Sequence, residues 1–240
     1  TFLPDKEIFE TTDFVYDTLK IRLRELAYLN KGLRITLEDK RAGQEKKDSF
    51  CYEGGIRSFV EDLNASREQL LFPQPLYFEE ADGDTMCEVA IQYNESYNEV
   101  IYSYANNVNT IDGGTHVEGL RLALTKVIND YGKKAGLMKE SDKLSGEDVR
   151  EGITAVVSVK LVNAQFESQT KDKLNNSFIR SFVSQCVTEH LSAFMEENPS
   201  AAKELVMRCL TAQKARDAAR AARDLTRRKG VLENSTLPGK

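Results

Sequence analysis

The sequence I-T-A-V-V-S-V-K-L-V, from Ile153 to Val162, is a nearly continuous apolar run between Gly152 and Asn163. A strand covered on both faces of a sheet needs such a run, whereas a strand with one face in water alternates apolar and polar residues. The run therefore predicts a central strand that is buried on both sides.

The residues after this strand predict two long helices. A loop over 163–175 precedes apolar residues with the i, i+3, i+4, i+7 spacing of a helix that buries one face. They are Phe178, Ile179, Phe182, Val183, Cys186, Val187, Leu191, Phe194 and Met195. Asn198 and Pro199 then supply a cap and a first-turn proline for a second helix. We expect this helix to reach about Lys229, a length on the order of 45 Å, and to stop at Gly230.

The residues before the strand predict further paired elements. Val89–Tyr93 alternates apolar and polar side chains, and Val100–Tyr104 follows after a short polar turn, which favours an antiparallel pair. The pattern of a helix capping box, Ser or Thr followed three residues later by an acid, occurs twice. The two pairs are Thr115 with Glu118 and Ser145 with Asp148.

The first 76 residues predict a helix, a hairpin and a second helix. Helical spacing spans 12–30, alternation over 33–37 indicates a half-buried strand, and the polar stretch 39–48 suggests a hairpin tip. A return strand near Phe50 and a short helix over 56–63 follow. Strands and helices mix along the chain without regular alternation, so the predicted class is α+β.

Composition is typical of a globular protein whose cysteines are free thiols. Its 240 residues carry a net charge of −5, with 40% hydrophobic and 30% charged residues. No run approaches the roughly 20 apolar residues of a membrane span. The start lacks both a signal peptide and a Met, so we expect either an artificial boundary or a missing upstream region. The four cysteines form no C-x-x-C pair, which predicts buried thiols, no metal site and a cytoplasmic location.

Basic residues gather near the end of the chain. Residues 201–229 hold nine basic and three acidic side chains, a net charge of +6, so the remainder carries −11. A basic arm on an acidic body can mark a nucleic-acid contact, and a solvated helix face is the alternative.

No complete active site is evident, because the phosphate-binding G-x-x-x-x-G-K-[ST] loop and the hydrolase motifs are absent. Gln169-Thr170-Lys171 is the most suggestive feature, since an ammonium on a strand-to-helix loop can meet a terminal phosphate as a point charge. A solvated loop lysine is the alternative. Gly113-Gly114-Thr115-His116 opens a helix whose amides could hold an anion. We expect His116 to be a surface or packing residue, and Arg121 to be a surface residue or a phosphate contact.

Five stretches, read together and in order, resemble the B subunits of bacterial type IIA DNA topoisomerases, the gyrase type in particular. They are R-L-R-E-L-A-Y-L-N-K-G (Arg22–Gly32), D-G-G-T-H-V-E-G-L-R (Asp112–Arg121), R-E-G-I-T-A-V-V-S-V-K (Arg150–Lys160), Q-F-E-S-Q-T-K-D-K-L (Gln165–Leu174) and A-R-D-L-T-R-R-K-G (Ala222–Gly230). The resemblance covers essentially the whole chain, and Leu237–Lys240 resembles the junction before the family's metal-binding cleavage domain.

The resemblance implies a transducer segment similar to the second domain of ribosomal protein S5, with long C-terminal helices. It divides the chain into a core over 1–175, long helices over 176–229, and a linker over 230–240 toward the absent cleavage (TOPRIM) domain. In the family, the Q-T-K loop contacts the γ-phosphate of ATP in the preceding GHKL domain, so these roles carry over to Gln169 and Lys171, with Lys171 as the catalytic residue. The DNA-contact candidates that it implies are Arg121, Arg220, Arg223, Arg227 and Arg228.

The implied partners are the upstream ATPase domain, the downstream cleavage domain, gyrase A in an A2B2 complex, and double-stranded DNA. ATP and Mg²⁺ serve the intact subunit, and we expect neither nucleotide turnover nor DNA cleavage from these 240 residues alone. Two alternatives stay open at this point: the same segment of topoisomerase IV, and a non-catalytic S5-like interaction module. Fusing the missing upstream domain and measuring ATP turnover would separate an enzyme part from a scaffold.

Overall fold

The computed structural model describes residues 2–67 and 69–234, and of residues 228–234 it describes the backbone alone. The chain divides into two compact units, Thr1–Ala65 and Ser66–Lys240. The first unit closes a core of its own, in which Tyr28 stacks on Tyr52 and Phe59.

The first unit consists of a hairpin and two helices. Helix α1 (Tyr16–Leu29) packs on strands β1 (Ile35–Asp39) and β2 (Lys46–Phe50), and α2 (Ile56–Leu63) follows. The antiparallel strands pair from Ile35 with Phe50 to Asp39 with Lys46, so they extend into the stretch 39–48 that was expected to be the hairpin tip. Backbone pairing uses the same amide groups whatever the side chain, so polarity alone located the turn poorly.

The second unit is built on a five-stranded sheet. Its strands are β3 (Leu76–Asp82), β4 (Thr85–Tyr93), β5 (Val100–Ala105), β6 (Val108–Asn109) and β7 (Ile153–Lys160), in the order β3-β4-β7-β5-β6. Strand β7 lies in the middle, and its first seven residues are buried. The predicted central strand and the mixed α and β composition are both confirmed.

The predicted antiparallel pair of β4 with β5 is wrong. Strand β7 lies between them, antiparallel to β4 and parallel to β5. The most apolar strand takes the centre, where both faces leave water, and this separates two strands that are consecutive in the sequence. Strand β3 was not predicted, because its second half is polar and exposed.

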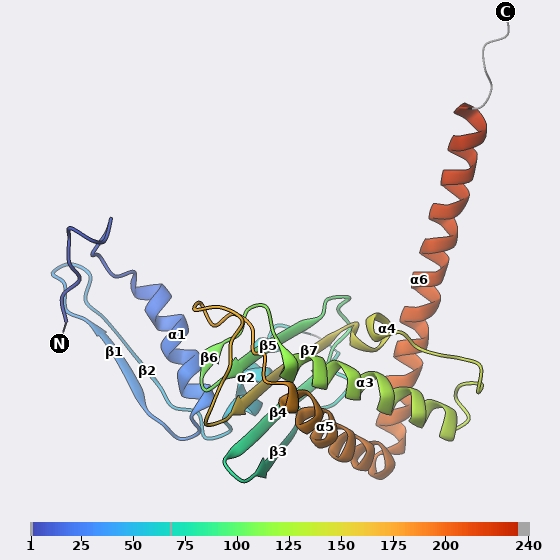
Figure 1. Ribbon diagram of the computed structural model, residues 1–240, viewed down its shortest axis with the longest axis horizontal. Coiled ribbons are helices and arrows are strands. Elements are labelled where there is room, and N and C mark those ends of the chain that lie inside the picture. The colour runs from blue at the N-terminus through green and yellow to red at the C-terminus, as the bar shows by residue number, and fades with distance from the viewer. Residues whose placement is uncertain (1, 68, 235–240) are drawn as a thin grey trace, which may run out of the picture. The chain divides into compact units, whose positions relative to one another are not determined.

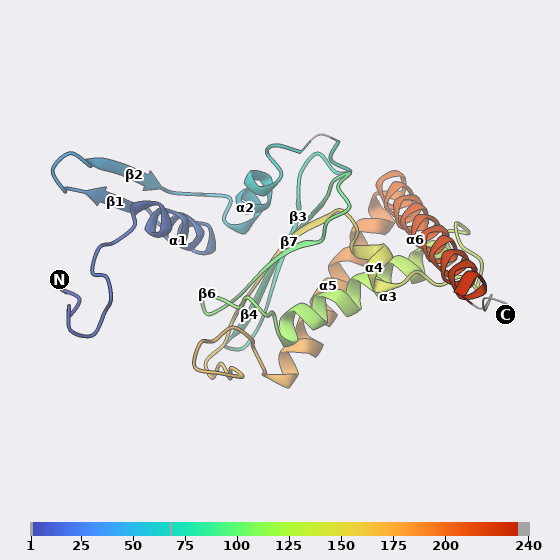
Figure 2. The same ribbon diagram turned by 90° about the horizontal axis from the view of Figure 1, so that it is seen from above.

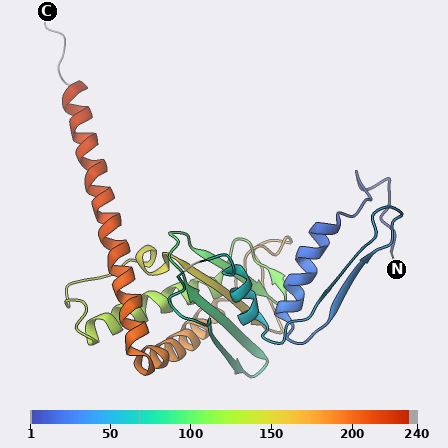
Figure 3. The ribbon, with the colours of Figure 1, turned by 180° about the vertical axis from the view of Figure 1, so that it is seen from behind.

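Helices cover one face of this sheet. The four helices are α3 (Thr115–Lys134), α4 (Gly146–Arg150), α5 (Ser177–Glu197) and α6 (Pro199–Asn234). Helices α3 and α5 pack on each other and lie on the same face of the sheet, as Figure 2 shows. They meet closely at Gly119, where an added Cβ would lie 2.5 Å from the carbonyl oxygen of Arg180. Helix α6 continues well beyond the elements that it contacts (Figures 1 and 3).

The helix ends test the predicted caps. The Ser145–Asp148 capping box is present, with both hydrogen bonds formed. The Thr115–Glu118 box is wrong, since Gly114 is the N-cap and no side chain caps α3. The stop at Gly230 is also wrong, because α6 continues through it to Asn234. One glycine costs a helix only about 1 kcal/mol relative to alanine. The rest of the expected linker, 235–240, lies outside the described residues.

No helix in the described ranges is long and apolar enough to cross a membrane. The same residues contain no cluster of three or more His, Cys, Asp or Glu side chains that could hold a metal ion. Cys186 and Cys209 are buried, as predicted.

Candidate functional site

Gln169 and Lys171 lie at the tip of an ordered loop between β7 and α5. The two arms of the loop pair with each other: the Glu167 amide donates to the Lys173 carbonyl at 3.0 Å, and the Asn175 amide donates to the Gln165 carbonyl at 2.8 Å. Residues 168–172 therefore form a short tip on a paired stem. The stem limits how the tip can move relative to the strand and the helix that it joins.

The foot of the loop is fixed by a buried side chain. Asn176 accepts from the Gln165 amide at 2.7 Å and donates to the Asn163 carbonyl at 2.9 Å. It directly precedes α5, so one amide group ties the arm of the loop that leaves β7 to the start of that helix.

Lys171 has a left-handed backbone, with φ of 61°. Its amide donates to the Ser168 carbonyl at 3.2 Å, and the hydroxyl oxygens of Ser168 and Thr170 lie 2.6 Å apart across the turn. Few residues other than glycine adopt this conformation. The side chain is exposed, and its ammonium lies 5.9 Å from the ring centroid of Phe166. The turn thus presents a cation to solvent, with Gln169 exposed beside it.

The loop docks against the start of α3, where the second predicted motif lies. The Asp112 amide donates to the Asp172 carbonyl at 2.9 Å, the Leu174 amide donates to the Gly113 carbonyl at 3.1 Å, and the Thr115 amide donates to the Leu174 carbonyl at 3.0 Å. Gly114 is in backbone contact with Leu174, and an added Cβ would overlap the Leu174 carbonyl oxygen. The structure therefore brings the G-G-T-H and Q-T-K motifs together.

This docking changes how the start of α3 is interpreted. The sequence allowed its free amides to hold an anion, but the Leu174 carbonyl already accepts from the Thr115 amide. A backbone oxygen thus occupies one of the first-turn amides that a bound anion would need.

His116 is a packing residue, one of the two roles expected. It is fully buried, and its Nε2 lies 3.0 Å from the Thr110 hydroxyl oxygen. Burial lowers the pKa of His116 to about 4. The ring is therefore neutral near pH 7 and does not face the loop tip as a cation.

Arg121 is ion-paired on the exposed face of α3. Its guanidinium donates twice to Glu99, at 2.6 and 3.0 Å, and Arg150 donates to the other oxygen of the same carboxylate at 2.8 Å. Partial burial alone would raise the pKa of Glu99, but the hydrogen bonds from the two arginines hold that pKa below its ordinary value. Sequence reasoning missed Glu99, because no local pattern links it to Arg121.

The remaining arginine candidates lie on the outer part of α6. Arg220, Arg223 and Arg227 are exposed, and Arg223 donates only to the carbonyl of Ala219 one turn earlier, at 3.3 Å. The side chain of Arg228 lies outside the described residues. The three described arginines have their charges in solvent, where a phosphate could reach them.

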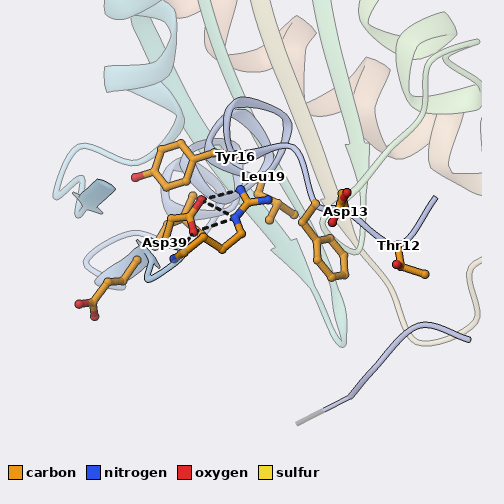
Figure 4. A pocket seen from close by; sticks show the side chains of 9 residues that line it. Thr12, Asp13, Tyr16, Leu19 and Asp39 are labelled. Atoms are coloured by element: carbon orange, nitrogen blue, oxygen red, sulfur yellow. Dashed lines mark hydrogen bonds and ion pairs between the residues drawn. The ribbon is translucent and has the colours of Figure 1, made fainter. Parts of the chain in front are cut away.

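The first unit has a hollow of about 300 Å³ between the start of α1 and the end of β1. Asp39 and Arg41 form one wall through paired hydrogen bonds, with Tyr16 and Leu19 beside them (Figure 4). The hydrogen bonds from Arg41 lower the pKa of Asp39 to about 2. None of the predicted site residues lines this hollow.

Comparison with known proteins identifies the family. The family model described as DNA gyrase B matches residues 55–225. The DNA gyrase B subunits of Clostridium acetobutylicum and Halalkalibacterium halodurans are 54% and 55% identical over all of this chain, which covers 37% and 38% of their lengths.

Solved structures agree with this. The 43K ATPase domain of Thermus thermophilus gyrase B, solved with an aminocoumarin, has a TM-score of 0.78 and 41% identity over 92% of this chain and 59% of its own. The ATP-binding domain of Francisella tularensis topoisomerase IV has a TM-score of 0.76 at 27% identity, over 89% of this chain and 57% of its own. The chain spans less than two fifths of the length of these two curated relatives, and it belongs to the DNA gyrase B family.

Proposed function

We propose that this chain is the transducer segment of a gyrase B subunit, with an S5 domain 2-like core. It couples ATP binding and hydrolysis in an adjacent GHKL domain to strand passage and negative supercoiling of DNA. Family membership supports this proposal, and the 54% identity to the Clostridium acetobutylicum gyrase B, against 27% to the topoisomerase IV neighbour, favours gyrase. The subunit acts with ATP and Mg²⁺ and assembles with gyrase A and with its own cleavage domain.

The observation that carries the proposal is the exposed ammonium of Lys171 at the tip of a braced loop. A cation held by a paired stem and a left-handed turn needs little reorganisation to meet a phosphate. In the intact subunit it meets the γ-phosphate, whose charge grows as the terminal bond breaks. Gln169, two residues earlier, adds an amide donor.

The loop also explains how nucleotide state reaches distant helices. Asn176 joins the stem to the first turn of α5, and Gly113 and Leu174 join it to α3. A force on the tip therefore acts on two helices that pack closely on each other. ATP binding favours the state in which Lys171 contacts the phosphate, and hydrolysis removes that contact and releases the helices.

The arginines of the outer α6 contact DNA phosphates in this scheme. Arg220, Arg223 and Arg227 are exposed on one arm, and Arg121 contributes once it leaves Glu99. Phosphate contacts of this kind hold a duplex without reading its sequence. The 240-residue chain alone carries out neither nucleotide turnover nor DNA cleavage.

The test is Lys171→Ala in the intact subunit, with Lys173→Ala as the matched control. Lys173 lies two residues away and is ion-paired with Glu167 at 3.0 Å, so its ammonium has a local partner. We expect Lys171→Ala to lower kcat for ATP by about 10²–10³-fold, as for loss of one transition-state donor, and Lys173→Ala to stay within about twofold. Near-normal turnover in the Lys171 variant would reject the role.

A further inference from the structure

We infer that the ion pair of Asp148 with Arg216 is the joint that sets the direction of the outer α6 helix relative to the sheet. Asp148 lies on α4, and Arg216 lies on α6. The guanidinium grips the carboxylate with two hydrogen bonds, Nε to Oδ1 at 2.8 Å and a terminal nitrogen to Oδ2 at 3.0 Å. Two parallel bonds fix the relative orientation of two groups as well as their distance.

The carboxylate half of the joint is rigid. The Asp148 side chain is only 1% exposed, and its Oδ2 also accepts from the Ser145 amide at 2.8 Å and the Ser145 hydroxyl at 2.7 Å. Helix α4 ends at Arg150, three residues before β7, so Asp148 is held close to the start of the central strand. The loop that carries Lys171 begins at the other end of the same strand.

Arg216 is the last anchored residue of α6 in the described range. The buried stripe of the helix runs through Ala202, Leu205, Val206, Cys209 and Ala212, and Arg216 takes the next position of that stripe. Gln213 adds a bond to the Lys143 carbonyl at 2.9 Å. The guanidinium also lies 3.8 Å from Asp217 on its own helix, and every residue from 217 to 227 is exposed.

The position of the pair gives it leverage. Residues 217–234 extend α6 past Arg216, and at 1.5 Å per residue a tilt of about 10° there moves the far end by roughly 5 Å. The contact farthest along a stiff helix restricts its tilt most. Neither residue needs to touch DNA or nucleotide, so both are positioning residues.

The first test uses the 240-residue chain and needs no activity. Spin labels are attached at two exposed positions, Lys126→Cys on α3 and Asp224→Cys on α6, in a Cys51→Ser background. The distribution of distances between the two labels reports the orientation of the outer part of α6. Arg216→Gln should widen that distribution by roughly 2 Å, the displacement that the same 10° tilt gives at residue 224, which lies about 12 Å past the joint. Arg220→Gln removes an exposed arginine one turn further out and should leave it narrow.

A double variant separates the joint from a simple stability effect. Arg216→Gln strands a buried carboxylate, which can disturb α4 by itself. Asp148→Asn combined with Arg216→Gln removes that charge, and glutamine is too short to restore both bonds. The joint predicts a wide distribution in the double variant as well. A narrow distribution in the double variant, or in Arg216→Gln itself, would overturn the inference.

The consequence for activity rests on the proposed function. In the intact enzyme, Arg216→Gln should keep ATP turnover within about twofold while supercoiling per ATP falls by about tenfold, as when one element of a two-state linkage is released. Supercoiling per ATP equal to wild type would overturn the role in coupling. Because the spin-label result does not depend on ATP, failure of the Lys171 test would leave the joint standing, and the reverse also holds.

Discussion

Gly114→Ala tests the docking of the lysine loop on α3, and its effect can be worked out from the structure. The glycine has φ of +131°, a region that L-residues rarely adopt, and an added Cβ would overlap the backbone of Leu174. Relieving the overlap must separate the two segments. Separation breaks the bond from the Thr115 amide to the Leu174 carbonyl and the bond from the Leu174 amide to the Gly113 carbonyl.

The magnitude follows from these two effects. Backbone strain of this kind costs on the order of 1–3 kcal/mol, and two buried backbone hydrogen bonds add about 1 kcal/mol each. We therefore expect Gly114→Ala to lower the free energy of unfolding by about 3–5 kcal/mol. Gly136→Ala is the matched control, since Gly136 has φ of +69° but nothing within 4 Å of an added Cβ, so it carries strain alone.

The assay is urea unfolding of the 240-residue chain followed by circular dichroism, with midpoint and slope compared between variants. Hydrogen exchange of the Leu174 amide, a donor in the dock, reports the local effect directly. We expect Leu174 to exchange faster in Gly114→Ala and unchanged in Gly136→Ala. If the two variants lose equal stability and Leu174 stays protected in both, the close approach is not what holds the loop.

Three further predictions concern charge and accessibility. Because burial lowers the pKa of His116 to about 4, below its ordinary 6.5, the unfolded chain binds the extra proton between these values, and stability falls as pH drops through that window. As pH is lowered from 7 to 5, the free energy of unfolding should fall by up to about 1.4 kcal/mol per pH unit more in wild type than in His116→Gln, and parallel curves would refute the assignment. Replacing Arg220, Arg223 and Arg227 by Gln should reduce the salt dependence of duplex binding by up to about three in log–log slope, and an unchanged slope would exclude them as phosphate contacts. Iodoacetamide at neutral pH should modify Cys51 and spare the buried Cys87, Cys186 and Cys209. Burial also raises the pKa of Cys209 to about 12, so its thiol stays protonated. Mass spectrometry that shows label on Cys209 in the folded chain would contradict this.

Local patterns predicted much of this protein, because a buried face of a strand or helix requires apolar residues at regular spacing in the sequence. The apolar run at Ile153 gave the central strand, and the helical spacing after Phe178 gave α5. The Ser145 capping box was also predicted correctly, since both of its partners lie within one helical turn. The exposure of Lys171 also followed from the sequence, because a polar loop between a buried strand and a helix lies at the protein surface.

Only the tertiary structure decided which elements meet. Nothing local indicates that β7 separates β4 from β5, because the apolar pattern records that a strand is buried and not which strand lies beside it. Leu174 caps α3, Glu99 holds Arg121, and Asp148 holds Arg216, although these partners are far apart along the chain. Such contacts depend on chain segments folded against each other, so these partners became visible only in three dimensions.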